Sequence, residues 1–235
     1  PVARFCTVAP EYLRSEMRAF DADILSEDMT KCTIDTPEAK EAIRFWTDLV
    51  TKYHVVSPEV VSYSDDDDWR TFGAGGTAMA MVGPWAIETY DRLYPDLDYG
   101  VAMLPSLKRG VPGSFGMVHM GWGVGKGTQY WEAVKKFMKF ALRPEIDAWL
   151  TDSLPAVKAS TNAPASKERL QKCPGLAVYT EQLERSYPSI LLLPGGPQIA
   201  REVNLAIQRI IFGADFDTVI NEATTIIDEL LQKEW

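Results

Sequence analysis

The sequence predicts an α/β protein, in which short apolar strands alternate with longer amphipathic helices. Glycine or proline bounds three apolar runs of strand length, at 77–82, 99–104 and 118–124. Other segments repeat apolar residues at every third or fourth position, which is the spacing of a helix with one buried face. These helical segments lie at 37–53, 129–142, 199–210 and 219–230.

The first predicted helix has a start signal at its N-terminus. Asp35 or Thr36 is the expected N-cap, and Pro37 suits the first turn, where its missing N–H is not needed. The apolar face of this helix includes Trp46. We therefore expect Trp46 and its neighbour Phe45 to be core residues rather than ligand contacts.

Acidic residues mark two further helix starts. Gly213 is expected to end one helix, and Asp215 or Asp217 to begin the next. The four consecutive acids at 65–68 have two interpretations, a calcium site or a helix N-terminus. No EF-hand glycine and distal glutamate follow them, so the sequence favours the helix N-terminus, where the dipole attracts negative charge.

The most informative stretch is FGAGGTAMAMVGPWAI, residues 72–87. It predicts a glycine-rich turn, a strand, and a break at Gly83-Pro84, because proline cannot donate to a strand ladder. Trp85 follows this break directly. Two interpretations stay open for Trp85: a ring presented to a ligand beyond a strand end, or a core residue at the start of a helix. Trp69, shortly upstream, is a second candidate for a ligand cleft.

Composition and motifs exclude several functional classes. A net charge of −9 without a basic stripe argues against binding to nucleic acid or to an anionic membrane surface. No apolar run approaches the ~20 residues of a transmembrane helix. The segment Gly125-Lys126-Gly127 is not a phosphate loop, because Met120 stands where the motif needs its first glycine.

The three cysteines do not indicate a metal site or another cofactor. Cys6, Cys32 and Cys173 show no Cys-x-x-Cys spacing and no accompanying histidine cluster. Cys32 is expected to be a small buried hydrophobe, while a Cys6–Cys32 disulfide stays open, since sequence alone does not fix pairing.

The sequence also favours binding over catalysis. His54 and His119 are isolated, and neither a Gly-x-Ser-x-Gly nor a His-Glu-x-x-His motif is present. Tryptophan is abundant instead, with seven residues, two of which, Trp85 and Trp122, follow proline or glycine. Aromatic platforms with a few polar side chains suit the apolar faces and hydroxyl rims of sugar rings. A carbohydrate-active enzyme is the alternative, because the acids are too numerous to exclude a catalytic carboxylate pair.

The chain resembles the family 1 extracellular solute-binding proteins, the sugar-capturing subunits of ABC importers related to maltose-binding protein. The resemblance rests on segments that follow in order along the chain. These are CTIDTPEAKEAIRFWTDLV (32–50), the glycine-rich stretch at 72–87, YGVAMLP (99–105), MGWGVGKGT (120–128) with WEAVKKFMKFAL (131–142), and LPAVKAS (154–160).

The resemblance implies a type II periplasmic-binding-protein lobe, a three-layer α/β sandwich. Residues 1–103 and 154–235 would belong to the C-terminal lobe, and 104–153 would return to the N-terminal lobe. The match starts partway through the family pattern, and the opening PVARFCTVAP carries no signal peptide. We therefore expect a fragment whose partners include the missing N-terminal lobe.

The resemblance also implies a function and a site. The function is capture of a sugar or related solute in the periplasm or at the outer face of the cytoplasmic membrane, with a lipoprotein anchor as one option, for delivery to an ABC permease. A sensor module that docks on a receptor is a further alternative. The implied ligand-binding residues are Trp85 and Gly83 of the Gly-Pro-Trp motif, Gly121 and Trp122 of the returning strand, Gln198 and Arg201 of a cleft-lining helix, Tyr12 at an upstream aromatic position, and Trp69.

Overall fold

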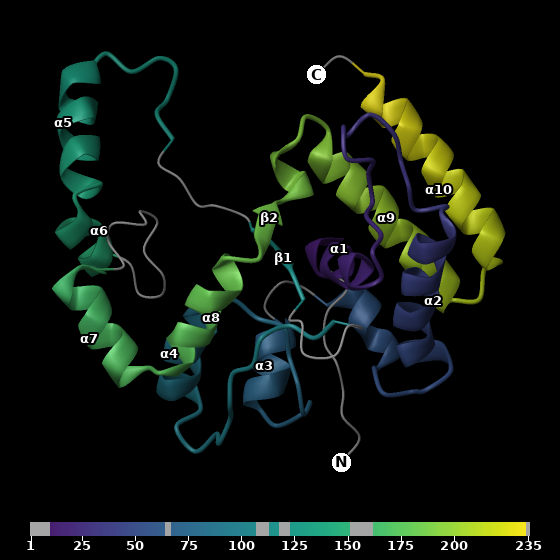
Figure 1. The fold of residues 1–235 in the computed structure, drawn as a ribbon, viewed down its shortest axis with the longest axis horizontal. Helices are drawn as coiled ribbons and strands as arrows, with labels where there is room; N and C mark the ends of the chain where they lie inside the picture. Colours follow the sequence, from purple (N-terminus) through teal and green to yellow (C-terminus); the bar gives the residue numbers. More distant parts are fainter. Residues whose placement is uncertain (1–9, 64–66, 107–112, 118–122, 151–161, 234–235) are drawn as a thin grey trace. The chain divides into compact units, whose positions relative to one another are not determined.

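The computed structural model describes residues 10–63, 67–106, 113–117, 123–150 and 162–233. The chain forms two compact units, whose elements Figure 1 labels. The first unit comprises 1–82, 103–118 and 182–235, and the second comprises 83–102 and 119–181. Within the described ranges, every helix is too short or too polar to span a lipid bilayer.

The first unit consists mainly of helices, with a short parallel pair of strands. Its elements are α1 (Pro10–Ala19), α2 (Pro37–Thr51), η1 (Pro58–Ser62), α3 (Asp67–Gly73), β1 (Phe115–Met117), β2 (Ser186–Pro188), η3 (Ile190–Leu192), α9 (Gly196–Ile211) and α10 (Phe216–Leu231). In the strand pair, Phe115 lies opposite Ser186 and Met117 opposite Pro188. A parallel pair needs a long crossover between its strands, and residues 119–181 of the second unit lie within this crossover along the chain.

The second unit is helical in its described part. It contains α4 (Trp85–Leu93), α5 (Trp131–Ala141), α6 (Pro144–Leu150), α7 (Pro164–Lys172) and most of α8 (Gly175–Leu183). The predicted helix at 129–142 is confirmed as α5, but its apolar side chains are not buried. Trp131, Phe137 and Phe140 are each about half exposed, whereas Ala141 is buried.

Helix boundaries agree with the predicted start and stop signals. Thr36, rather than Asp35, caps α2, because its hydroxyl accepts a hydrogen bond of 3.3 Å from the Ala39 amide. Asp215, rather than Asp217, caps α10 through the Thr218 amide at 2.9 Å. Gly213 adopts a φ of 92° between α9 and α10, a conformation that glycine takes without the steric penalty of a Cβ.

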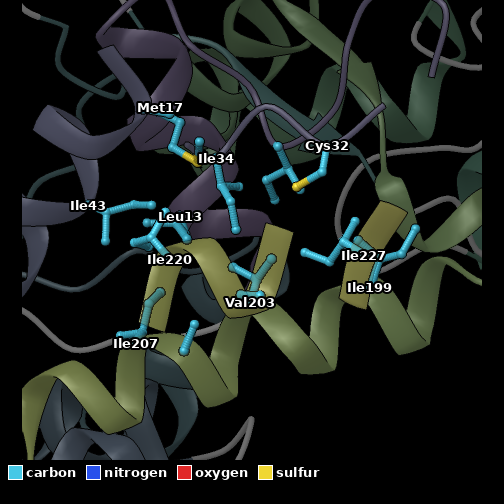
Figure 2. Close-up of a cluster of buried hydrophobic side chains, with 14 of the residues drawn as sticks. Leu13, Met17, Cys32, Ile34, Ile43, Ile199, Val203, Ile207, Ile220 and Ile227 are labelled. Carbon is cyan, nitrogen blue, oxygen red and sulfur yellow. The ribbon is translucent and has the colours of Figure 1, made fainter. Parts of the chain in front are cut away.

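The core of the first unit is built by helices from both ends of the chain. Figure 2 shows Leu13 and Met17 of α1 and Ile43 of α2 among the residues that meet the apolar faces of α9 and α10. The predicted face of α9 is confirmed, since Ile199, Val203, Ile207 and Ile210 are all buried. Each such side chain stabilises the fold by roughly 1.5–3 kcal/mol.

Two side chains predicted to lie on buried helix faces are exposed instead. Trp46 is buried, but Phe45 is 42% exposed, and its ring lies 5.6 Å from that of Phe20. On α10, Ile227 is buried where the prediction placed Ile226. Successive helical residues point about 100° apart, so a residue beside a buried one can point away from the core.

The predicted strands at 77–82 and 99–104 are not strands in the structure, and most of 118–124 lies outside the described residues. An apolar run indicates burial, but a strand also needs a neighbour with which to form a hydrogen-bond ladder. In the described ranges, only β1 and β2 form such a ladder, beside a single bridge between Leu25 and Cys32.

Cys32 is fully buried and free, as predicted for a small hydrophobe. Burial raises the pKa of its thiol to about 11. Its amide donates a 2.6 Å hydrogen bond to the Asp228 carboxylate of α10. Cys6, the other half of the disulfide left open above, lies outside the described residues.

Helix α1 is held by charged groups as well as by the core. The Arg14 guanidinium pairs with both carboxylate oxygens of Asp23, at 2.6 and 3.0 Å, and donates to the Pro188 carbonyl at 2.8 Å. Arg18 pairs with the same carboxylate, and both guanidinium groups lie over the Tyr187 ring, 4.6 and 4.3 Å from its centroid. This cluster joins α1 to β2.

Glu16, on the same helix, is a mostly buried carboxyl whose desolvation raises its pKa to about 7. Because the native pKa lies above the ordinary value of 4.5, the native state binds the proton more tightly than the unfolded chain does. Ionised Glu16 therefore destabilises the fold. The penalty is absent below pH 4.5, grows as pH rises, and is complete above pH 7.

We predict that Glu16→Gln, which removes the ionisation, stabilises the protein at pH 8 but not at pH 4. The gain at pH 8 should reach up to about 3 kcal/mol, from ~1.4 kcal/mol per unit of pKa difference. Chemical denaturation at the two pH values measures it. Glu41→Gln, on the exposed side of α2, is the control and should show no such pH-dependent gain. An equal effect of Glu16→Gln at both pH values would contradict the prediction.

The turn between Leu25 and Cys32 places Met29 at a φ of 60°. The Asp28 carboxylate orders this turn by accepting from the Ser26 and Thr30 hydroxyls at 2.7 and 2.8 Å. Met29 itself is 40% exposed and contributes little to the core.

We predict that Met29→Gly stabilises the protein by about 1 kcal/mol. A side chain in the left-handed region costs roughly 1–2 kcal/mol, which exceeds the entropic cost of one glycine. Thermal unfolding measures the gain. Met79→Gly, at a similarly exposed methionine with negative φ, should give no stabilisation. Equal shifts in melting temperature for both variants would disprove the role of Met29's backbone conformation.

Candidate ligand site

The structure distributes the predicted site residues over both units. Trp85 and Gly83 belong to the second unit, and Tyr12, Trp69, Gln198 and Arg201 belong to the first. Gly121 and Trp122 lie outside the described residues. The predicted site residues thus belong to different units, and the ligand role of each residue stays a prediction.

Trp85 is the first residue of α4, directly after Pro84. Its side chain is 40% exposed, so the indole is not a core residue of the unit. The Trp85 carbonyl accepts a 3.1 Å hydrogen bond from the Thr89 hydroxyl, one turn further along α4. A large ring is thus held at the start of a helix and remains open to solvent.

Gly83 lies directly beneath the Trp85 ring. A Cβ atom on Gly83 would lie 2.5 Å from the indole Nε1 and 2.7 Å from Cδ1. Real Cβ atoms essentially never approach a neighbour so closely. The five-membered ring of the indole therefore packs against the glycine backbone.

A groove of about 510 Å³ lies beside Pro84 in the second unit. Helices α4, α6, α7 and α8 contribute to its walls, which are lined by Pro84, Ile87, Glu88, Asp91, Trp149, Ala165, Glu168, Arg169, Lys172, Cys173 and Leu176. Trp149 is 72% exposed at its edge. No local sequence pattern indicates this groove, because α4 and α7 are far apart in the chain.

The polar groups of the groove largely satisfy one another. Lys172 pairs with Glu168 at 2.8 Å, and an Arg169 nitrogen donates to the Ala148 carbonyl at 3.3 Å. Burial raises the pKa of the Cys173 thiol, and the Asp91 and Glu88 carboxylates raise it further. A thiol with a raised pKa is a poor nucleophile at neutral pH, so the groove does not have the chemistry of a cysteine active site.

Trp69 occupies a different setting from Trp85. It belongs to α3, whose first turn carries Asp67 and Asp68, as expected for acids at a helix N-terminus. The indole is only 8% exposed, and the Arg70 guanidinium lies 5.0 Å from the ring centroid. In this structure the Trp69 ring packs within the first unit.

Gln198 and Arg201 lie in the first turns of α9, and both are exposed. The helix follows Gly195, which has a φ of 70° and takes the N-cap position. Arg201 makes no ion pair with another described residue, so its guanidinium is available to an anionic or hydroxyl-bearing group. Sequence analysis placed these two residues correctly at the start of a helix.

Tyr12 lies in α1, and its side chain is outside the described part of the structure. Asp21 and Ala22 follow shortly after α1. Asp21 adopts a φ of 58°, the left-handed conformation that glycine favours. The backbone therefore forms a glycine-like turn at this point although the residue is aspartate.

Comparisons with known proteins identify the relatives of this chain. The bacterial extracellular solute-binding protein family matches residues 9–177, which is most of the chain. A putative binding protein of Brucella abortus (strain 2308) is 26% identical over 228 residues, covering 94% of this chain and 53% of that protein. The maltodextrin-binding protein MdxE of Bacillus subtilis (strain 168) is 25% identical over 202 residues, covering 84% of this chain and 46% of its own. The chain thus spans about half the length of these relatives.

Solved structures show the same fold. Maltose-bound MalE3 of T. maritima superposes with a TM-score of 0.81 at 22% identity, over 97% of this chain and 61% of that one. A solute-binding protein of an ABC transporter from Thermotoga lettingae, bound with α-D-tagatose, gives 0.76 at 21% identity, over 98% and 60%. UgpB of Mycobacterium tuberculosis, in complex with glycerophosphocholine, gives 0.77 at 17% identity, over 97% and 58%.

These comparisons confirm the resemblance and the fold class predicted from the sequence. The neighbours are binding proteins rather than enzymes, which agrees with the prediction that the chain is not an enzyme. Family membership also implies a location outside the cytoplasm. The chain belongs to the bacterial extracellular solute-binding protein family.

Proposed function

We propose that this chain is part of a protein that captures a sugar or oligosaccharide outside the cytoplasmic membrane and delivers it to an ABC importer. The main support for this proposal is Trp85, whose half-exposed indole lies at the start of α4, directly after Gly83-Pro84. A flat aromatic face accepts the apolar C–H face of a pyranose ring, while nearby polar groups bind its hydroxyls. Relatives described as maltose-bound, tagatose-bound and maltodextrin-binding support this ligand class.

We also propose ligand-binding roles for the other site residues expected from the family resemblance. Gln198 and Arg201 are exposed at the start of α9 and supply hydrogen-bond donors. Tyr12, Trp69, Gly121 and Trp122 complete the proposed ligand-binding set. The ligand requires no cofactor, because capture involves no bond-making step.

The proposed lobes are those of the family pattern, with 1–103 and 154–235 in the C-terminal lobe and 104–153 in the N-terminal lobe. Exposed apolar side chains on α5 support this division. Trp131, Phe137 and Phe140 are each about half exposed, and several exposed large apolar residues on one helix are typical of a surface that another part of a protein covers. In the complete protein, hinge closure of the lobes around the ligand would then present it to the permease.

An anionic solute is the second candidate, and Arg201 favours it. The Arg201 side chain is exposed and makes no ion pair with another described residue. A guanidinium binds phosphate or carboxylate through two parallel hydrogen bonds. The structural likeness to UgpB in complex with glycerophosphocholine supports including phosphate-bearing solutes in any ligand screen.

We predict that the 235-residue chain alone binds sugars weakly or not at all, because high affinity requires burial of the ligand from both sides. Titration calorimetry against maltose, maltotriose, tagatose and glycerophosphocholine measures this. Sub-micromolar binding by the chain alone would show that it holds a complete site. Release of products from these compounds would instead support the enzyme alternative.

In the complete protein, we predict that Trp85→Ala lowers affinity tenfold or more and leaves the melting temperature nearly unchanged. A stacked side chain contributes about 1–3 kcal/mol through ligand contact, which corresponds to this loss. Calorimetry and thermal unfolding of the same variant provide the measurement.

Two other aromatic residues provide controls. Phe212→Ala removes a ring that is 73% exposed at the C-terminal end of α9 and should not change affinity. Trp46→Ala removes a core indole and should cost about 3–5 kcal/mol of stability, while the folded fraction binds normally. If Trp85→Ala behaves like Trp46→Ala, the Trp85 indole is structural and the assignment fails.

A further inference from the structure

The contact between Gly83 and the Trp85 ring explains why glycine occupies position 83. Backbone conformation does not require it, because positive φ angles among the glycines occur at Gly75, Gly195 and Gly213 but not at Gly83. The Gly83 carbonyl accepts a hydrogen bond of 3.0 Å from the Ala86 amide, which any residue could provide. The remaining constraint is steric, since a Cβ would lie 2.5 Å from the indole Nε1.

We propose that Gly83 is a positioning residue that sets the orientation of the Trp85 indole and thereby the plane offered to the ligand. This inference rests on the proposed function, in which Trp85 is the stacking platform. Gly83 itself need not touch the ligand. It acts by letting the five-membered ring lie against bare backbone, with Cδ1 and Cε2 at 2.7 and 3.5 Å from the position of the missing Cβ.

A side chain at position 83 should displace the ring rather than disrupt the fold. The atoms that a Cβ would meet belong to the Trp85 side chain, which is 40% exposed, and not to backbone. Rotation of a half-exposed side chain loses few packing contacts, so the cost to stability is small. The loss of affinity should be larger than the loss of stability. A stacked ligand lies parallel to the indole, so a rotated ring no longer matches the orientation of the bound ligand.

The experiment first measures the ring without any ligand. The chain is labelled with 5-fluorotryptophan, and the Trp85 resonance is assigned by its loss in Trp85→Phe. We expect Gly83→Ala to shift this fluorine resonance and to raise its accessibility to a soluble paramagnetic agent, at an unchanged melting temperature. Gly100→Ala is the matched control, since a Cβ at Gly100 meets nothing within 4 Å, and it should leave the resonance in place.

The second measurement is affinity in the complete protein, for the compound of the calorimetric panel that binds it most tightly. Gly83→Ala should weaken binding about tenfold, as expected for loss of an aligned stacking contact. In the Trp85→Ala background, Gly83→Ala should not lower affinity further, because a residue that acts only through the Trp85 ring has no effect on binding when the ring is absent.

The outcomes separate this inference from the proposed function. An unmoved Trp85 resonance in Gly83→Ala, or a moved resonance with unchanged affinity, overturns the positioning role. An equal loss of affinity from Gly83→Ala with and without Trp85 also overturns it, since Gly83 would then act independently. Normal binding by Trp85→Ala alone overturns the proposed function, while the fluorine shift still decides whether Gly83 orients the ring.

Discussion

The first unit depends on one shared apolar core, to which helices from both ends of the chain contribute. Residues of α1 and α2 meet residues of α9 and α10, which follow more than 140 positions later. Helices of this length are marginal in isolation, so tertiary burial supplies most of their stability. The two pairs of helices therefore bury their apolar faces against each other.

Charged groups add specific hydrogen bonds and ion pairs to the contacts of this apolar core. Arg14 is mostly buried and bonds to both Asp23 and the Pro188 carbonyl, so it links α1 to the turn after it and to β2. Removing one partner would leave a buried charge uncompensated, which costs far more than an exposed ion pair contributes. The surface pair between Lys172 and Glu168 is the opposite case, because both side chains are largely exposed.

Local signals in the sequence predicted local structure well. Thr36, Asp215 and Gly213 act at helix ends through contacts within three or four residues, so their roles were readable before the fold was known. The apolar run at 77–82 was misread as a strand, because pairing with another strand depends on a distant segment. The groove beside α4 escaped prediction for the same reason, as its walls come from α4 and α7.

The candidate site shows the same division between local and distant constraints. Trp85 was identified from the Gly-Pro-Trp motif alone, and its position at the start of α4 follows from proline's fixed φ at the preceding residue. Its relation to Gln198 and Arg201 depends on parts of the protein far apart in sequence, so it remained a prediction from family resemblance.

A ligand platform has to be both exposed and rigid, and these two demands conflict. Burial would fix the indole but hide it, whereas full exposure would leave it free to rotate, and ordering it on binding would reduce affinity. Packing one edge of the ring against the backbone of Gly83 answers both demands, since the ring is restrained at Nε1 and Cδ1 and the side chain remains 40% exposed. In the proposed site, the glycine of the motif is therefore as important as the tryptophan, although it contributes no side chain.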